Sequence, residues 1–229
     1  MNHITAILFF SRTAQAEAQA KPLVLGKTSA QKVADLAIQQ AKKTALATGL
    51  PVFHVSEKQQ YGNTFGERFA NAFEDIYVQG FENVIAIGND CLTLTADNIL
   101  NAEELLATTP SVLGPTFDGG VYLIGFQKKS FSKDVFKSID WQTEKVFSQL
   151  SLLNENIKLL PILSDIDTFQ DLKLQLEYIN IRLKKAILSI IIEIVNCVQK
   201  PISIFVLKVY LSLKSLRAPP TVLYNKSNY

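Results

Sequence analysis

The chain has 229 residues, of which 48% are hydrophobic, and its formal charge at pH 7 is +2. This length and composition allow one sizeable hydrophobic core, so we expect one domain with an appendage. The near-neutral charge gives no reason to expect a nucleic-acid partner. The two cysteines exclude a disulfide framework and a cysteine-based metal site, which fits a reducing cytoplasm.

The first half of the chain alternates between short apolar runs and longer segments with helical spacing. Residues 4–10 are apolar, but the run is too short and has too little basic charge before it to be a secretory signal, so it predicts a strand. Residues 11–25 form the loop after this strand. The next predicted elements are a helix over residues 29–48, a strand over 52–55 and a helix over 65–78.

A buried strand and an acidic loop come next. Residues 84–87 form an apolar, mostly β-branched run that stops at Gly88, which indicates a strand buried on both faces. Asp90 lies just beyond the carboxyl end of this strand. Thr95 can cap a helix over residues 98–106, so the order is strand, acidic loop, helix.

A second cycle of this kind follows directly. Residues 112–113 enter a Gly114-Pro115 turn, Asp118-Gly119-Gly120 makes a tight loop, and residues 121–126 leave as another strand. In open α/β sheets, ligands bind in the crevice outside the carboxyl ends of the strands. The aspartates of both loops are therefore candidate functional residues.

The last predicted strand ends in a third acidic loop. A helix over residues 144–153 precedes this strand, which covers residues 157–163. Asp165 and Asp167 follow it, and Thr168 begins a capping pattern for a helix that runs to residue 180. A doubly wound sheet would bring Asp90, Asp118 and Asp167 to one edge. Such a group of carboxylates is costly unless a cation joins them.

Residues 181–229 differ in kind from the rest of the chain. They hold eight basic residues and one acid, so residues 1–180 have an acidic balance. Apolar residues follow helical spacing over residues 183–216, but no window of about eighteen residues is free of charge, so we expect no spanning helix. The segment fits an anionic membrane surface, a homodimer interface or a cover for the sheet. We favour association, because Ser203 is the one polar position in residues 202–207.

Two motifs carry a resemblance to a known family: GNDCLTLT, which begins at Gly88, and LGPTFDGGVYLIG, which ends at Gly125. They resemble the G-x-D-C-P-D-L and G-P-x-x-D-G-G-Y-Y-L-I-G motifs of bacterial glycosyltransferase-A-like proteins, the radical-SAM/selenodomain-associated transferases of the nucleotide-diphospho-sugar transferase superfamily. Leu92 and Thr93 stand where that family has Pro and Asp. The resemblance implies an α/β fold, a Rossmann-like three-layer glycosyltransferase-A domain, over residues 1–180. Residues 181–229 then form a helical C-terminal extension.

The resemblance also implies a metal and a catalytic group. The first acidic loop of the superfamily usually holds a divalent metal, so Asp90 is the first expected ligand of Mg²⁺ or Mn²⁺ and Asp167 the second. It gives Asp118 a substrate-orienting or general-base role, for which we treat it as the catalytic candidate. Gly119 and Gly120 would let the substrate approach the backbone closely. Each aspartate could instead be a turn or cap residue.

The expected nucleotide contacts are cations. In the superfamily a glycine-rich first loop binds the phosphates, and here Arg12 and Lys21 remain in a loop that lacks the glycine and contains Glu17. The resembling Gly-Glu-Arg segment places Arg68 near the nucleotide, unless it is an ordinary exposed residue of a helix. Trp141 either walls the acceptor pocket or anchors the core. Asp90 would contact both the nucleotide and its metal.

Together these features predict a metal-dependent glycosyltransferase with a nucleotide-sugar donor and an unknown acceptor, weakened by its altered first loop. The alternative is a nucleotidyltransferase that releases pyrophosphate, since the D-I-D-T ending, which starts at Asp165, resembles that of molybdenum-cofactor nucleotidyltransferases. A catalytically inactive binding scaffold of the same fold is the third reading. We expect a cytoplasmic protein, with peripheral membrane association as one of the two roles open to residues 183–216.

Overall fold

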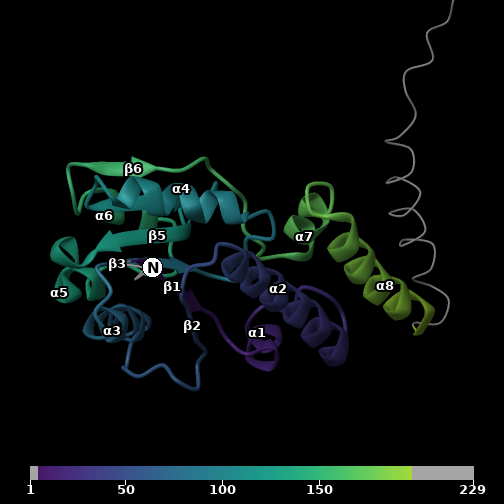
Figure 1. Cartoon of the computed structure of the whole chain (residues 1–229). Helices are drawn as coiled ribbons and strands as arrows, with labels where there is room; N and C mark the ends of the chain where they lie inside the picture. The colour runs from purple at the N-terminus through teal and green to yellow at the C-terminus, as the bar shows by residue number, and fades with distance from the viewer. Residues whose placement is uncertain (1–4, 198–229) are drawn as a thin grey trace, which may run out of the picture.

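A six-stranded mixed sheet forms the centre of the protein (Figure 1). The computed structural model describes residues 5–197. The strands are β1 (Thr5–Phe10), β2 (Val52–Val55), β3 (Asn83–Ile87), β4 (Ser111–Pro115), β5 (Val121–Gln127) and β6 (Ile157–Leu159), in the spatial order β2-β1-β3-β5-β4-β6. Strand β5 runs antiparallel to β3 and β4, and the other neighbouring pairs are parallel.

Helices cover both faces of the sheet. They are α1 (Ala14–Ala20), α2 (Lys27–Ala47), α3 (Phe65–Val78), α4 (Ala96–Leu106), α5 (Lys133–Lys137), α6 (Val146–Ser151), α7 (Phe169–Gln175) and α8 (Ile181–Cys197), with a 3-10 turn at Lys128–Ser130. The core of one face includes residues of α3, α5 and α6, and that of the other residues of α2 and α4. This is the three-layer α/β arrangement of the glycosyltransferase-A fold that the motifs predict, so the predicted fold class is confirmed.

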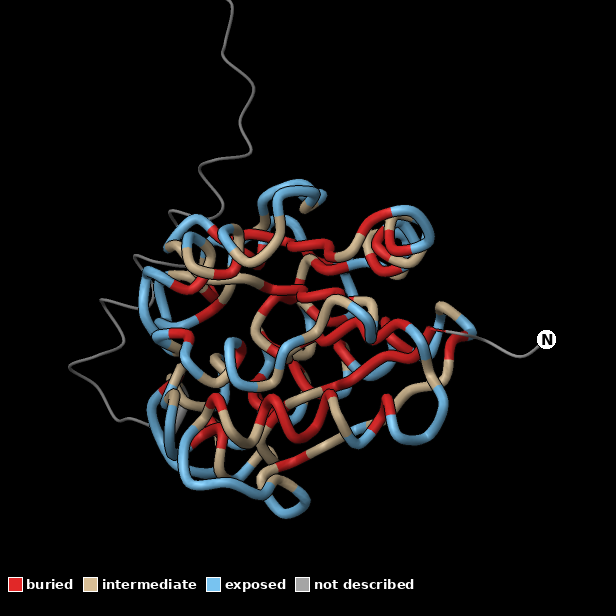
Figure 2. Tube along the Cα trace, turned by 90° about the vertical axis from the view of Figure 1, so that its left-hand side faces the viewer, coloured by how far each residue is buried: buried red, intermediate tan, exposed pale blue. Residues whose placement is uncertain are grey.

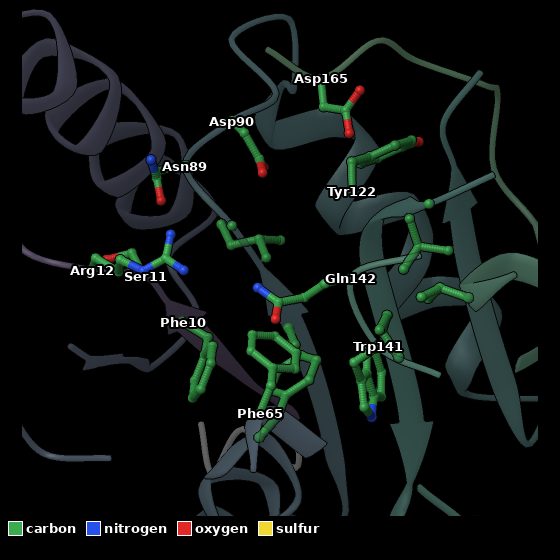
Figure 3. A pocket seen from close by; sticks show the side chains of 18 of the residues that line it. Phe10, Ser11, Arg12, Phe65, Asn89, Asp90, Tyr122, Trp141, Gln142 and Asp165 are labelled. Atoms are coloured by element: carbon green, nitrogen blue, oxygen red, sulfur yellow. The ribbon is translucent and has the colours of Figure 1, made fainter. Parts of the chain in front are cut away.

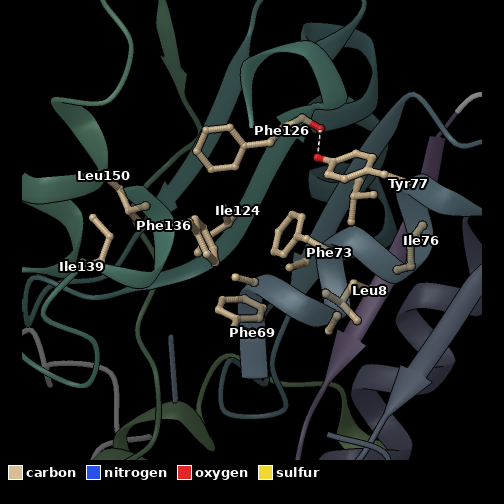
Figure 4. Close-up of a cluster of buried hydrophobic side chains, with 14 of the residues drawn as sticks. Leu8, Phe69, Phe73, Ile76, Tyr77, Ile124, Phe126, Phe136, Ile139 and Leu150 are labelled. Carbon is tan, nitrogen blue, oxygen red and sulfur yellow. Dashed lines mark hydrogen bonds between the residues drawn. The ribbon is translucent and has the colours of Figure 1, made fainter. Parts of the chain in front are cut away.

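The two cores follow from the alternation of side chains along the strands, as β1 shows. Ala6 and Leu8 belong to the core on the side of α3, whereas Ile7 and Phe9 belong to the core on the side of α2 and α4. All four residues are fully buried, as are most residues of the central strands (Figure 2). The first core is rich in aromatic rings (Figure 4), and its Tyr77 hydroxyl donates a 3.0 Å hydrogen bond to the Phe126 carbonyl.

Three of the helices within residues 5–197 begin with a reciprocal capping box. Thr64, Thr95 and Thr168 each accept a hydrogen bond from the backbone three residues later, and the side chain at that later position bonds back to the cap. The sequence predicts two of these caps, Thr95 and Thr168, because capping depends on residues close together in the chain. The boxes fix where α4 and α7 start, and both starts lie next to acidic loops.

Some local predictions are wrong. The first loop contains helix α1, whose cap Thr13 donates from both its backbone nitrogen and its hydroxyl to the Glu57 carboxylate, each at 2.6 Å. Gly114-Pro115 is no turn but the end of β4, where the register with β5 shifts, and the turn lies at residues 116–120. Strand β6 ends at Leu159, four residues earlier than predicted.

The described part of the C-terminal extension packs on the domain. Leu183, Ile187 and Ile190 of α8 are buried in a third hydrophobic cluster with residues of α1, α2 and α7. The described residues contain no helix that is long and apolar enough to cross a membrane. Residues 183–197 of the predicted association segment, residues 183–216, are described, and the remainder of that segment lies outside the described residues.

Candidate active site

A cavity of about 800 Å³ opens at the carboxyl ends of β1, β3 and β4, where the sequence places its acidic loops (Figure 3). Asp90 reaches it from the loop after β3, Asp118 from the hairpin between β4 and β5, and Asp165 and Asp167 from the segment after β6. The sheet thus gathers loops that are far apart in the sequence. Arg12, Lys21, Arg68, Gly120 and Trp141, which the sequence also singles out, line the same cavity.

Three of the carboxylates form a compact cluster. Asp118, Asp165 and Asp167 each have an oxygen within 4.8 Å of those of the other two. Asp118 is oriented by its own turn: its Oδ1 accepts hydrogen bonds from the Thr116 hydroxyl at 2.5 Å and from the Gly120 backbone at 3.0 Å. The other oxygen of Asp118 makes no hydrogen bond to the described residues. It remains free for a ligand.

The charge of this cluster is only partly compensated. Burial, followed by the charges of Asp118, Asp90 and Asp167, raises the pKa of Asp165 to about 6. Among the described residues, seven acidic and three basic side chains line the cavity, so this part of the site has an excess of negative charge. Carboxylate oxygens are the donors that Mg²⁺ and Mn²⁺ prefer. The donor set and the charge excess both fit a divalent cation.

Lys21 links the cluster to Asp90. Its ammonium lies 2.5 Å from Oδ1 of Asp167 and 3.3 Å from Oδ2 of Asp90. Burial by itself would lower the pKa of Lys21, but the charge of Asp90, the hydrogen bond to Asp167 and its charge outweigh this effect and raise the pKa. The structure thus groups Asp167, the second expected metal ligand, with Asp118 and Asp165. Asp90, the first expected ligand, lies outside this group and pairs with Lys21.

The other two cations differ in their partners. The guanidinium of Arg12 lies 3.3 Å from the carboxylate of Glu17, which is buried in α1. Arg68 makes no ion pair with the described residues, and its one side-chain hydrogen bond there is a long contact of 3.5 Å to the Asn63 carbonyl. Arg68 is therefore freer than Arg12 to contact a phosphate.

Gly119 and Gly120 have separate tasks. Gly119 has φ 88°, and a Cβ atom there would lie 2.2 Å from the carbonyl oxygen of Glu144, so the glycine lets the segment before α6 pack against the hairpin. Gly120 lines the cavity and donates the backbone hydrogen bond that orients Asp118. Only Gly120 contributes directly to the cavity wall.

Aromatic rings form the opposite end of the cavity (Figure 3). Phe10, Phe65 and Trp141 are partly exposed there, and they lie on the buried rings of the first core. The Trp141 indole nitrogen donates a 2.9 Å hydrogen bond to the Phe136 carbonyl. Gly66 makes room for this indole, since a Cβ atom at position 66 would come within 2.8 Å of it.

Sequence reasoning assigned no site role to several cavity residues, among them Asp165, Gln142 and Glu144. A sequence pattern could have placed Asp165 in the site, because Asp165 and Asp167 share the D-I-D-T motif and alternate residues of an extended segment point the same way. Gln142 and Glu144 have no such pattern. They lie in the irregular segment before α6, and contacts distant in sequence hold that segment against the hairpin.

Comparisons with known proteins agree with this fold. Residues 13–143 match the model of the family DUF2064, described as an uncharacterized protein conserved in bacteria. The crystal structure of a candidate nucleotide-diphospho-sugar transferase from Desulfovibrio desulfuricans G20 has a TM-score of 0.66 and 23% identity, over 75% of this chain and 86% of that one. A mycobacterial homolog of Rv0371c, from strain JC1, has a TM-score of 0.47 and 11% identity, over 81% and 98% of the two chains. No curated protein matches the sequence. The first of these structures supports the fold, and the second is too distant to add to the argument.

Proposed function

Since the chain belongs to the bacterial family DUF2064 and has the fold of nucleotide-diphospho-sugar transferases, we propose that it is a metal-dependent glycosyltransferase with a nucleotide-sugar donor. One observation carries the proposal: the carboxylates of Asp118, Asp165 and Asp167 lie together beside Lys21 in a cavity that opens at the carboxyl ends of the central strands. Transfer from a nucleotide sugar leaves negative charge on the departing diphosphate, which a divalent cation and ammonium or guanidinium groups stabilise.

Asp165 and Asp167 hold Mg²⁺ or Mn²⁺ in this proposal, and the free oxygen of Asp118 completes the set. When bound, the cation neutralises the diphosphate. Asp90 and Asp167 hold Lys21 in place to face the phosphates, so Asp90 supports the nucleotide through Lys21. An acceptor hydroxyl attacks the anomeric carbon, loses its proton to a base and forms the new glycosidic bond, and the nucleoside diphosphate leaves with the electrons of the broken bond.

Asp118 has a second candidate role, as that base. The hydrogen bonds from Thr116 and Gly120 fix one of its oxygens and leave the other for an acceptor hydroxyl. Asp118→Asn separates the two roles. If Asp118 is a ligand, the variant binds the metal more weakly. If Asp118 is the base, the variant binds metal and donor normally but loses turnover.

Nucleotide binding is weak in this proposal. Arg12 is already paired with Glu17, so a phosphate must compete with a buried carboxylate for it. Arg68 makes no ion pair with the described residues and contributes the free positive charge. Loss of one charge-assisted phosphate contact weakens binding by about tenfold to a hundredfold. Glu17→Gln should therefore strengthen nucleotide binding.

Calorimetry with uridine, guanosine, cytidine and adenosine diphosphates, with and without Mg²⁺ or Mn²⁺, tests the proposal. We expect binding of at least one nucleotide that requires the metal and is lost in Asp167→Asn. Glu104→Gln is the matched control, because Glu104 is exposed on α4 and does not line the cavity. If no nucleotide binds, the inactive scaffold is the better reading of the fold.

A nucleotidyltransferase is the second candidate, favoured by the fact that both acids of the D-I-D-T motif reach the cavity. Its donor is a nucleoside triphosphate, and its second product is pyrophosphate. The released product therefore decides between the two activities: a nucleoside diphosphate from a sugar nucleotide supports the glycosyltransferase, and pyrophosphate supports the nucleotidyltransferase.

The C-terminal extension is proposed to mediate association, either with an anionic membrane surface or with a second copy of the chain. The inner face of α8 is buried in the domain, which leaves the outer face of α8 and the apolar residues after position 197 for this role. Vesicle sedimentation and sizing should compare the full chain with one that ends at Cys197. A chain cut before α8 would lose Leu183 and Ile187 from the core and would be a poor control.

A further inference from the structure

The aromatic end of the cavity has a wall that the binding of a nucleotide and a metal does not explain. Trp141 and Gln142 form it, in the segment that joins α5 to α6 (Figure 3). This segment packs on the β4–β5 hairpin, since the Phe147 backbone donates a 2.9 Å hydrogen bond to the Gly119 carbonyl and the carbonyl of Glu144 lies against Gly119. The wall is therefore on the same side of the cavity as Asp118.

The wall presents a ring face and an amide. The indole nitrogen of Trp141 already donates to the Phe136 carbonyl, so the part of Trp141 that remains for a ligand is its apolar ring. Phe65 extends this surface, with its ring centroid 5.6 Å from that of Trp141. The side chain of Gln142 points into the cavity between the rings and the carboxylates, and it has no hydrogen-bond partner among the described residues.

The backbone of Gln142 is held in a conformation that its residue type disfavours. Its φ is 65°, and it is the one non-glycine residue with positive φ in the described part of the chain. Neighbouring hydrogen bonds hold the segment: the Asp140 backbone donates to the Gln149 side chain at 2.7 Å, and the Thr143 hydroxyl donates to the Asp140 carbonyl at 2.6 Å. Strain that the surroundings enforce is common where a side chain must be aimed at a ligand.

The position of the wall assigns it to the acceptor and not to the nucleotide. Arg12 and Lys21, two of the cations expected to face the phosphates, follow β1, two strands away from β5 in the sheet. Trp141 and Gln142 lie on the hairpin side, because their segment packs against Gly119. The β4–β5 hairpin and the segment between α5 and α6 contribute two charged side chains to the cavity, Asp118 and Glu144, and both are acids that would repel an anionic acceptor.

We propose, on the basis of the proposed function, that the wall formed by Trp141, Gln142 and Phe65 seats an acceptor with an uncharged, flat-faced ring. The ring stacks on the indole, and its polar edge bonds to the Gln142 amide. A sugar ring and an aromatic ring share this chemistry, so the test includes both.

Trp141 is the one tryptophan of the sequence, so its fluorescence reports directly on the wall. The full chain is titrated, in the presence of Mg²⁺, with methyl glucoside, with benzyl alcohol and with glucose 6-phosphate. We expect a saturable change of emission with at least one uncharged ring, and affinity for the phosphate lower than for methyl glucoside by about tenfold, from like-charge repulsion. Saturation by methyl glucoside alone identifies a sugar acceptor, and saturation by benzyl alcohol alone an aromatic one.

Two variants test the role of Gln142. Gln142→Gly removes the amide and relieves the positive φ, so it should bind the ring about threefold to tenfold more weakly while its resistance to urea is unchanged or higher. Gln142→Asn keeps an amide in a residue that tolerates positive φ, and should recover part of the affinity. Unchanged ring affinity in Gln142→Gly would overturn the role of the amide.

The proposal is overturned if neither uncharged ring changes the emission. It is also overturned if a nucleoside diphosphate with Mg²⁺ shifts the emission and competes with the ring, because the wall then holds the nucleobase. Failure of the proposed function looks different: calorimetry detects no nucleotide binding, while the ring titration still shows whether the wall binds an uncharged ring.

Discussion

Asp165→Asn should make the metal-free protein more stable, and it should reduce the stabilisation that a bound metal gives. The raised pKa of Asp165 means that its ionised form is disfavoured in the folded state, chiefly by burial and then by three neighbouring carboxylates. A rise from the ordinary value of 3.8 to about 6 corresponds to about 3 kcal/mol. Because Asp165 is only half-buried, solvent screening reduces the expected gain to about 1–2 kcal/mol. Asparagine has the same shape and no charge.

The stability gain of Asp165→Asn should depend on pH. The folded state binds the Asp165 proton more tightly than the unfolded state, so the wild-type protein loses stability as the pH rises from about 4 to about 6. Above about pH 6 the folded state bears the full free-energy cost of an ionised Asp165, and below about pH 4 this cost is absent. The advantage of Asp165→Asn should therefore be present at pH 7 and vanish at about pH 4.

Urea unfolding in EDTA, at pH 7 and pH 4, measures the gain, and thermal unfolding at pH 7 with increasing Mn²⁺ measures the metal effect. A metal that binds the folded state raises the melting temperature of the wild type, and it should raise that of the variant less. Glu104→Gln, exposed and away from the cavity, should show neither effect. Equal stability of wild type and variant at pH 7 in EDTA, or an equal gain at both pH values, would refute the electrostatic reasoning.

Three further predictions concern single residues. Lys21→Gln should weaken nucleotide binding by about tenfold to a hundredfold in calorimetry, since it removes the ammonium between two acidic loops; unchanged affinity would show that the phosphates bind elsewhere. Ile187→Ala should lower the free energy of unfolding in urea by about 2–4 kcal/mol, because Ile187 is 1% exposed, whereas Ile192→Ala on the outer face should change it by less than about 1 kcal/mol. Gly119→Ala should cost more stability than Gly49→Ala, because both have positive φ but only the first would place a Cβ atom against backbone; equal costs would mean that this loop shifts freely.

The sequence predicts well those features that depend on neighbouring residues. The strand over residues 52–55 and the helix over residues 65–78 have the predicted bounds, since a short apolar run and a capped amphipathic pattern are local signals. Helix α1 was missed because the resemblance to a phosphate-binding loop suggested irregular backbone. Its alanines and the Thr13 cap, supported by Glu57 from another strand end, favour a helix instead.

The sequence predicts which acidic residues reach the candidate site, but not which of them cluster together or pair with Lys21. Asp90, Asp118 and Asp167 stand at strand ends, and the order of strands and loops brings them to one edge of the sheet. Which acids come within reach of one cation depends on loop geometry that no local pattern encodes. Lys21 joins Asp90 to Asp167 across the sheet edge, and Asp165 reaches the cluster in place of Asp90.

The short hairpin between β4 and β5 limits how this chain can vary in length. Residues 116–120 close it through a 3.1 Å hydrogen bond from the Thr116 backbone to the Gly120 carbonyl, and both strands that it joins lie inside the sheet. A residue inserted there would displace Asp118 or shift two strands whose side chains fill both cores. Residues 152–156 connect α6 to β6 at the surface, and Leu152 is 85% exposed. Insertions and engineered tags should be accepted in that connection and rejected in the hairpin.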